Sequence, residues 1–113
     1  MDSDSPKRKW KRCKVDMRVR LRQWEKPENA ASVVRTFELS EGGMSIYASE
    51  TLEAGTRWVV EFSLPQGDGL LKINAVVRNR RGFRCGLEFV DIAEFQQNEI
   101  ARYLSSLADV IEI

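Results

Sequence analysis

The chain has 113 residues, which is enough for one domain with a hydrophobic core and too few for two. Hydrophobic residues make up 42% of it and charged residues 31%, which excludes wholesale disorder, and no apolar run is long enough to span a membrane. The net charge is only +1, yet residues 7–22 hold nine Lys/Arg and one Asp, a local net charge of +8, so we expect an anionic partner near the N-terminus.

The first predicted element is a flexible basic segment, residues 1–14. Its stretch PKRKWKRCK places six cationic side chains and one tryptophan in nine residues. Taken alone, such a run is usually a solvated tail, and the alternative is that it forms half of a binding site for an anion. A strand follows, because apolar and polar residues alternate strictly from Val15 to Arg22.

Five more strands are indicated by β-branched or alternating segments between Gly- or Pro-marked turns. We expect them at residues 32–40, 44–49, 57–65, 70–80 and 83–90. Six strands with short connections favour an antiparallel barrel or sandwich, and a single small sheet usually closes to protect its edges.

The last segment changes to helical spacing. Apolar residues recur with that period from Ile92 to Leu107, and Asp91 with Glu94 suggests an N-cap and its capping-box partner. We therefore predict an all-β fold with a C-terminal helix, a six-stranded antiparallel β-barrel over residues 15–113. Its amphipathic helix, at about residues 92–108, is expected to lie over an open end of the barrel.

The sequence offers little material for catalysis. It contains no histidine, which removes Ser-His and Cys-His nucleophiles and His-based metal sites. Its two cysteines, Cys13 and Cys85, are too few for a four-ligand zinc site and are expected to be free thiols. The N-terminus lacks the apolar core of a signal peptide. We expect a cytoplasmic protein that is not an enzyme, holds no metal and needs no cofactor.

Two arginines, Arg8 and Arg12, are separated by three residues and lie directly before the first strand. A guanidinium can pair bidentately with a phosphate or with guanine O6 and N7. Lys7 and Lys9 would add unspecific attraction for an anion, and Trp10 could either stack on a base or pack on the barrel mouth.

A second group lies where a predicted strand runs into a glycine turn. Alternate residues of a strand share a face, so Glu38 and Ser40 should both point out of the barrel. Gly42 and Gly43 could take positive φ and let a ligand approach bare backbone.

These two groups on this order of strands resemble the PilZ domain family, receptors of the bacterial second messenger cyclic di-GMP. The family pattern is RxxxR before the first strand and [D/N]xSxxG at the junction of the second and third strands. The segments LSEGGMSI, LEAGTRWVVEFSLP and RCGLEFVDI also resemble the family, so the match covers nearly the whole chain. The resemblance implies a cyclic di-GMP site formed by Arg8, Arg12, Glu38, Ser40 and Gly43, with Lys7, Lys9, Trp10 and Gly42 as accessory residues.

One position departs from the family pattern, because Glu38 stands where the family has Asp or Asn. A carboxylate can accept hydrogen bonds from N1 and N2 of guanine. Glu keeps that head group on a stem one methylene longer, so the chemistry is preserved and the geometry changes.

Three functions are compatible with these observations. The favoured one is a cyclic di-GMP receptor that signals to an unidentified protein effector. The second is a PilZ-like adaptor that does not bind the dinucleotide, which the departure at Glu38 supports. The third is a small basic barrel that binds single-stranded nucleic acid, which we consider unlikely because its strands lack a row of exposed aromatic side chains.

Overall fold

The computed structural model describes residues 10–48, 52–67 and 69–111, and residues 108–111 through their backbone alone. The described part of the chain contains six strands followed by one helix. The strands are β1 (Cys13–Gln23), β2 (Ser32–Ser40), β3 (Gly43–Tyr47), β4 (Arg57–Ser63), β5 (Leu70–Arg81) and β6 (Arg84–Val90), and the helix is α1 (Glu94–Ile111). The predicted order of elements is confirmed.

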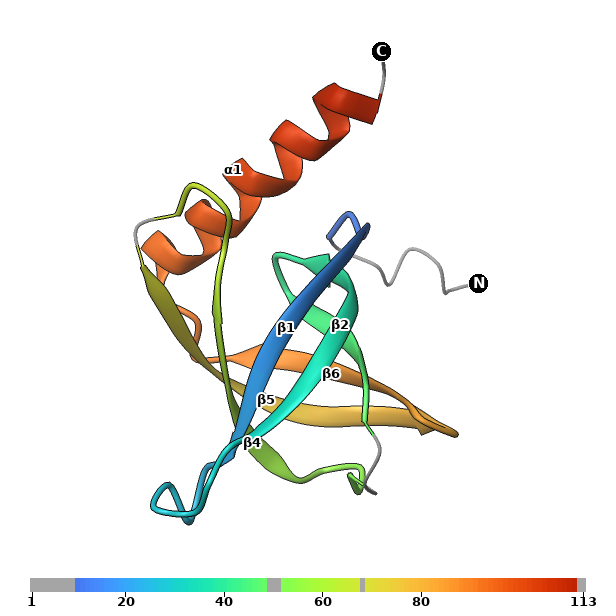
Figure 1. Cartoon of the computed structure of the whole chain (residues 1–113), viewed down its shortest axis with the longest axis vertical. Coiled ribbons are helices and arrows are strands. Elements are labelled where there is room, and N and C mark those ends of the chain that lie inside the picture. The colour runs from blue at the N-terminus through green and yellow to red at the C-terminus, as the bar shows by residue number, and fades with distance from the viewer. Residues whose placement is uncertain (1–9, 49–51, 68, 112–113) are drawn as a thin grey trace.

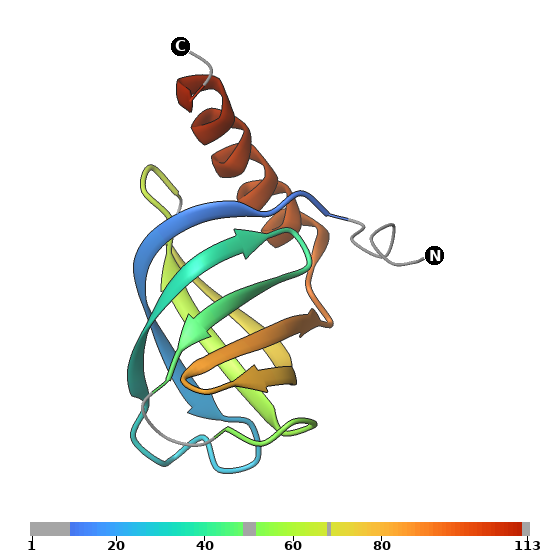
Figure 2. The same ribbon diagram turned by 90° about the vertical axis from the view of Figure 1, so that its right-hand side faces the viewer.

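The six strands close into one barrel in the order β1-β2-β3-β6-β5-β4, and all neighbours are antiparallel (Figure 1; Figure 2). β1 completes the closure, since it pairs with β2 along most of its length and with β4 through its last four residues. The predicted six-stranded antiparallel β-barrel is therefore confirmed.

The hydrophobic core fills the inside of the barrel, because the inward-facing residues of the strands are apolar. Val60, Ile46 and Val77 are fully buried there. Cys13 and Cys85 are both buried free thiols. Burial raises the pKa of the Cys85 thiol, an effect that the nearby charge of Arg80 opposes.

The helix α1 lies across one end of the barrel, and its C-terminal end points away from the strands (Figure 1). Ile100 is fully buried and Leu104 nearly so, which joins the apolar stripe of α1 to the core. The predicted N-cap at Asp91 is wrong, because this residue takes a left-handed φ of 58° and the helix begins at Glu94. The side chain of Gln96 instead accepts a 3.0 Å hydrogen bond from the backbone N–H of Ala93.

In the part of the chain that the structure describes, no helix is both long and apolar enough to cross a membrane.

The strand pairing is irregular in three places, the first of them in β1, between Lys14 and Met17 opposite β2. β2 carries an extra residue, Phe37, opposite β3, and β5 carries an extra residue, Arg78, opposite β6. Such bulges bend a strand and re-aim its side chains. Beyond them, Glu38 and Asn79 rejoin the ladder on the outer face of the barrel.

Candidate functional site

The connection between β2 and β3 is a tight turn held by Ser40. Its hydroxyl accepts a 3.1 Å hydrogen bond from the backbone N–H of Gly42 and donates one of 3.3 Å to the carbonyl oxygen of Gly43. The carbonyl oxygen of Gly42 accepts a 2.9 Å hydrogen bond from the N–H of Phe89 in β6. Ser40 thus fixes the shape of the turn, and β6 fixes its position.

Gly42 and Gly43 both lie very close to neighbouring atoms, which leaves no room for a Cβ atom. Neither residue takes the positive φ that the sequence suggested. A Cβ atom on Gly43 would lie 2.2 Å from the carbonyl oxygen of Leu87 in β6, and one on Gly42 would lie 2.3 Å from Cδ1 of Trp10. Small size therefore explains both glycines: one lets two strands meet, and the other lets an indole ring pack on the turn.

We expect Gly43→Ala to destabilise the barrel, because its methyl group would meet the backbone of β6, which cannot move without breaking the ladder. Overpacking of this kind costs about 1–3 kcal/mol, or several degrees in melting temperature. Gly42→Ala is the matched control, since its methyl group meets only the side chain of Trp10. Thermal unfolding of both variants tests this, and a larger loss in Gly42→Ala than in Gly43→Ala would contradict it.

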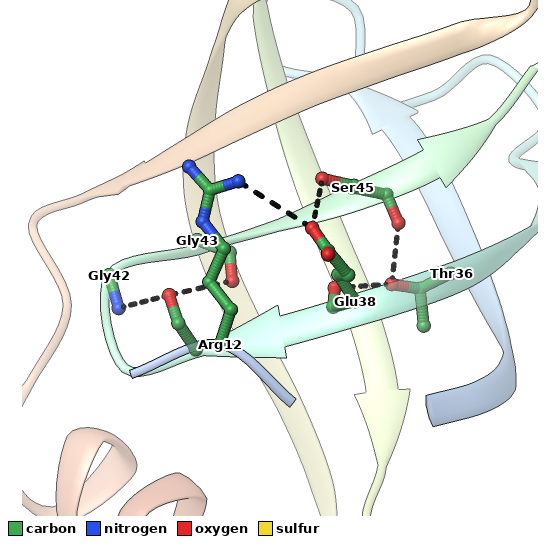
Figure 3. A network of polar contacts seen from close by, with 7 residues as sticks. Arg12, Thr36, Glu38, Gly42, Gly43 and Ser45 are labelled. Atoms are coloured by element: carbon green, nitrogen blue, oxygen red, sulfur yellow. Dashed lines mark hydrogen bonds and ion pairs between the residues drawn. The ribbon is translucent and has the colours of Figure 1, made fainter. Parts of the chain in front are cut away.

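Glu38 lies on the outer face of β2 and contacts two neighbouring segments (Figure 3). Its Oε1 atom is 3.6 Å from Nη1 of Arg12 and accepts a 3.4 Å hydrogen bond from the hydroxyl of Ser45. The side chain of Glu38 is 31% exposed and that of Arg12 is 45% exposed. Beneath them, the buried hydroxyl of Thr36 lies 3.0 Å from the carbonyl oxygen of Glu38 and 2.8 Å from that of Ser45. Arg12 and Glu38, which the sequence put in separate motifs, therefore lie side by side.

An open cleft of about 990 Å³ surrounds this pair. Its volume is at the upper end of the roughly 300–1,000 Å³ that is usual for small-molecule sites. The floor of the cleft is the outer face of four adjacent strands, where Glu38 faces Ser45 and Ser45 faces Gly86. Gly86 in turn faces Asn79 on β5. The cleft thus lies across the outer side of the sheet, and it is also bordered by four buried core residues, Leu39, Met44, Leu87 and Phe89.

The rim of the cleft brings the two predicted motifs together. Trp10 and Arg12 line it from the segment before β1, and residues 40–43 line it from the turn. Ile92, which precedes α1, and Gln97, near the start of α1, also line the cleft. Segments far apart in the sequence therefore converge on one site.

Some predicted site residues are placed and others are not. Trp10 packs against Gly42 at the cleft, which agrees with the packing interpretation of this residue in the absence of a ligand. Arg8, Lys7 and Lys9 lie outside the described residues.

The far wall of the cleft was missed by the sequence analysis. Arg78 lines it and donates a hydrogen bond from Nε to Oε1 of Glu88. Asn79 lies so close to Gly86 that a Cβ on this glycine would be 2.8 Å from Oδ1 of Asn79. Strand alternation could have marked these residues as outward-facing, but their place beside Glu38 follows from the register between strands.

The described lining of the cleft carries groups of both charges, two arginines (Arg12 and Arg78) and three carboxylates (Glu38, Glu41 and Glu88), so it can contact both phosphates and hydrogen-bond donors. Arg12 and Arg78 offer guanidinium groups for phosphates, and Glu38, Ser45 and Asn79 offer acceptors and donors for the edge of a base. Among the residues that the structure describes, no three His, Cys, Asp or Glu side chains gather as they would around a metal ion.

Comparison with known proteins gives a consistent result. The family model described as PilZ domain matches residues 6–106. The fold is similar to a PilZ domain with c-di-GMP of YcgR from Escherichia coli, at 19% identity and a TM-score of 0.70, with 93% of this chain and 95% of that chain covered. It is also similar to the PilZ domain of CeSA from a cellulose synthesizing bacterium, at 16% identity and a TM-score of 0.67, with 87% and 98% covered.

A third similar structure is the Bacillus subtilis inhibitor of motility, MotI/DgrA, at 18% identity and a TM-score of 0.71. The alignment covers 90% of this chain and 51% of that one, so this chain spans about half of MotI/DgrA. Among curated proteins, none matches this chain.

Proposed function

The chain belongs to the PilZ domain family, and on that premise we propose that it is a non-enzymatic receptor which binds cyclic di-GMP in the cleft and signals to a protein effector. The observation that carries the proposal is the convergence of Arg12, Glu38 and the turn at residues 40–43 on one cleft. Each of the two motifs alone is weak evidence for ligand binding. Together they are stronger evidence, because residues of both line the same cleft.

The ligand matches the chemistry of these groups. Cyclic di-GMP is a dianion with two guanine bases, and Arg12 can pair bidentately with a phosphate or with guanine O6 and N7. Glu38 can accept hydrogen bonds from N1 and N2 of guanine. Arg8 would supply the second guanidinium from the segment before β1, with Lys7 and Lys9 adding positive charge.

Glu38 and Arg12 must exchange partners when the ligand binds. In the free protein, Arg12 is 3.6 Å from the carboxylate of Glu38, and Ser45 donates to the same oxygen. The exposed ion pair is worth no more than about 1 kcal/mol, whereas hydrogen bonds that involve a charged group contribute about 1.5–3 kcal/mol each. Binding is therefore favoured over the internal pair.

The second candidate is a ligand-independent adaptor, and the same ion pair is the observation that favours it. Glu38 has a longer stem than the Asp or Asn of the family, and its carboxylate is already occupied by Arg12 and Ser45. A site whose two recognition groups satisfy each other could persist as a structural feature of the surface.

Isothermal titration calorimetry of the full chain separates the two. We expect binding of cyclic di-GMP and at least tenfold weaker binding of cyclic di-AMP, which has the same dianionic backbone but lacks the guanine O6, N1–H and N2 groups. Absence of heat with cyclic di-GMP would favour the adaptor, and equal binding of both dinucleotides would refute base recognition by Glu38. A single-stranded oligonucleotide serves as the third ligand and tests the nucleic-acid alternative.

A further inference from the structure

A row of exposed side chains crosses the outer face of the barrel next to the cleft. Arg18 of β1 faces Arg35 of β2, and Arg35 faces Tyr47 of β3. Tyr47 in turn faces Arg84 of β6, which faces Arg81 of β5. All five side chains are exposed. This arginine row spans four interstrand spacings, roughly 19 Å.

The row carries positive charge that the described residues do not neutralise. Arg35 pairs with Asp16 at 2.7 Å, but Arg18, Arg81 and Arg84 form no ion pair with any residue that the structure describes. Like charges directly opposite each other destabilise a sheet, and the row contains two such pairs. A bound acidic surface would relieve this repulsion.

Arg84 is held in place before any partner arrives. Its guanidinium carbon lies 5.4 Å from the ring centroid of Phe37 and 5.8 Å from that of Tyr47, and the two rings are 4.4 Å apart. A guanidinium that rests on two rings loses less side-chain entropy on binding. Phe83, 70% exposed, and Val33, 63% exposed, add apolar surface beside the row. Arginine with aromatic residues is the composition typical of protein-binding surfaces.

We infer that the arginine row docks an acidic segment of a partner protein, an inference that rests on the effector half of the proposed function. Unpaired guanidinium groups can bind carboxylates bidentately. Nucleic acid is a poorer fit, because the rings of Phe37 and Tyr47 pack on each other beneath Arg84 and so offer bases no free stacking platform.

The position of the row couples it to the cleft. Tyr47 and Arg84 each lie two residues along the strand from Ser45 and Gly86 of the cleft floor, a separation of about 7 Å. An acidic segment on the row would therefore border a ligand in the cleft. The charge of that ligand, and any movement of the rim, would change the affinity for the partner.

The inference is tested by following backbone amide resonances of the full chain while an acetylated and amidated peptide of four Glu-Leu repeats is added. We expect the largest shifts at the row on β2, β3 and β6, and none with the Lys-Leu counterpart. The double variant Arg18→Glu/Arg81→Glu places a glutamate opposite Arg35 and another opposite Arg84, so each pair of like charges becomes a pair of unlike charges. The melting temperature should therefore hold or rise, while the peptide should bind at least tenfold more weakly.

The control variant, Lys26→Glu/Arg102→Glu, makes the same change in net charge on a loop and on α1, and it should bind the peptide like the parent. Absence of shifts at the row, or equal loss in the control variant, would overturn the inference. Stronger shifts with single-stranded oligodeoxythymidylate than with the peptide would make the row a nucleic-acid surface instead. Cyclic di-GMP is titrated separately into the parent and into Arg18→Glu/Arg81→Glu. Neither Arg18 nor Arg81 lines the cleft. Failure of the parent to bind it would defeat the proposed receptor function and leave the peptide result standing.

Discussion

Replacing Arg12 with alanine should abolish measurable binding of cyclic di-GMP while leaving the melting temperature of the free protein nearly unchanged. Its side chain is 45% exposed, and its one ion pair, with Glu38, is a surface contact of little value to stability. A bidentate contact with the ligand is worth about 1.5–3 kcal/mol per hydrogen bond, so its loss weakens binding by about two orders of magnitude or more. In Arg12→Ala the carboxylate of Glu38 also loses its positively charged neighbour, so it repels the dianionic ligand.

Calorimetry with three variants makes this prediction specific. Arg12→Lys keeps the charge but not the planar fork and should fall between the parent and Arg12→Ala. Arg102→Ala removes the same charge from the exposed surface of α1 and should bind like the parent. Arg8→Ala should also lose binding if this arginine completes the site. If Arg12→Ala and Arg8→Ala combined bound as tightly as the parent, the ligand would have to lie elsewhere.

The second large effect is expected at Glu38. Glu38→Ala removes two opposing contributions: the acceptors for guanine, and the ion pair that occupies Arg12 in the free protein. The first is the larger, because unpaired base donors in a partly buried site cost about 1–3 kcal/mol, whereas the exposed ion pair contributes about 1 kcal/mol at most. We therefore expect Glu38→Ala to weaken binding about tenfold or more.

Glu38→Asp is the matched variant, because it keeps the carboxylate and restores the stem length of the family. Its shorter reach should loosen the contacts with Arg12 and Ser45, so binding is expected to be retained or improved. Titrating the parent and the two variants side by side measures this. Parent binding that is indifferent to Glu38→Ala would remove this residue from the proposed site. If Glu38→Asp binds cyclic di-GMP and the parent does not, the protein is an adaptor. The extra methylene group of Glu38 would then be the reason that it does not bind the ligand.

The fold could be predicted because its signals are local. Strict alternation from Val15 to Arg22 and the change to helical spacing after residue 91 depend only on neighbouring residues. The start of α1 was misplaced because Asp91 resembles a common N-cap, whereas its backbone takes a left-handed turn and the side chain of Gln96 caps the helix. Local sequence does not reveal which of two nearby caps tertiary packing selects.

The site was predictable only in part, for a physical reason. Glu38 and Ser40 could be placed on the outer face by strand period, but Asn79 and Gly86 join them through strand pairing that one sequence does not encode in any local pattern. The bulge at Arg78 shifts that pairing by one residue and was equally hidden. The role of Gly43 was misjudged for the same reason, since its close neighbour is the backbone of Leu87, more than 40 positions away in the chain.

The closure of the barrel also limits how any partner can be recognised. Every strand in the described part of the chain has a neighbour on both sides, although β1 meets β4 through its last four residues alone, so most of the barrel offers an incoming peptide no free strand edge for main-chain hydrogen bonds. A partner must then be recognised by outward-pointing side chains. These side chains take no part in the main-chain hydrogen bonds between strands or in the packing of the core. Substitutions there can change what is bound without changing how the chain folds, so one scaffold can acquire new partners while its architecture stays constant.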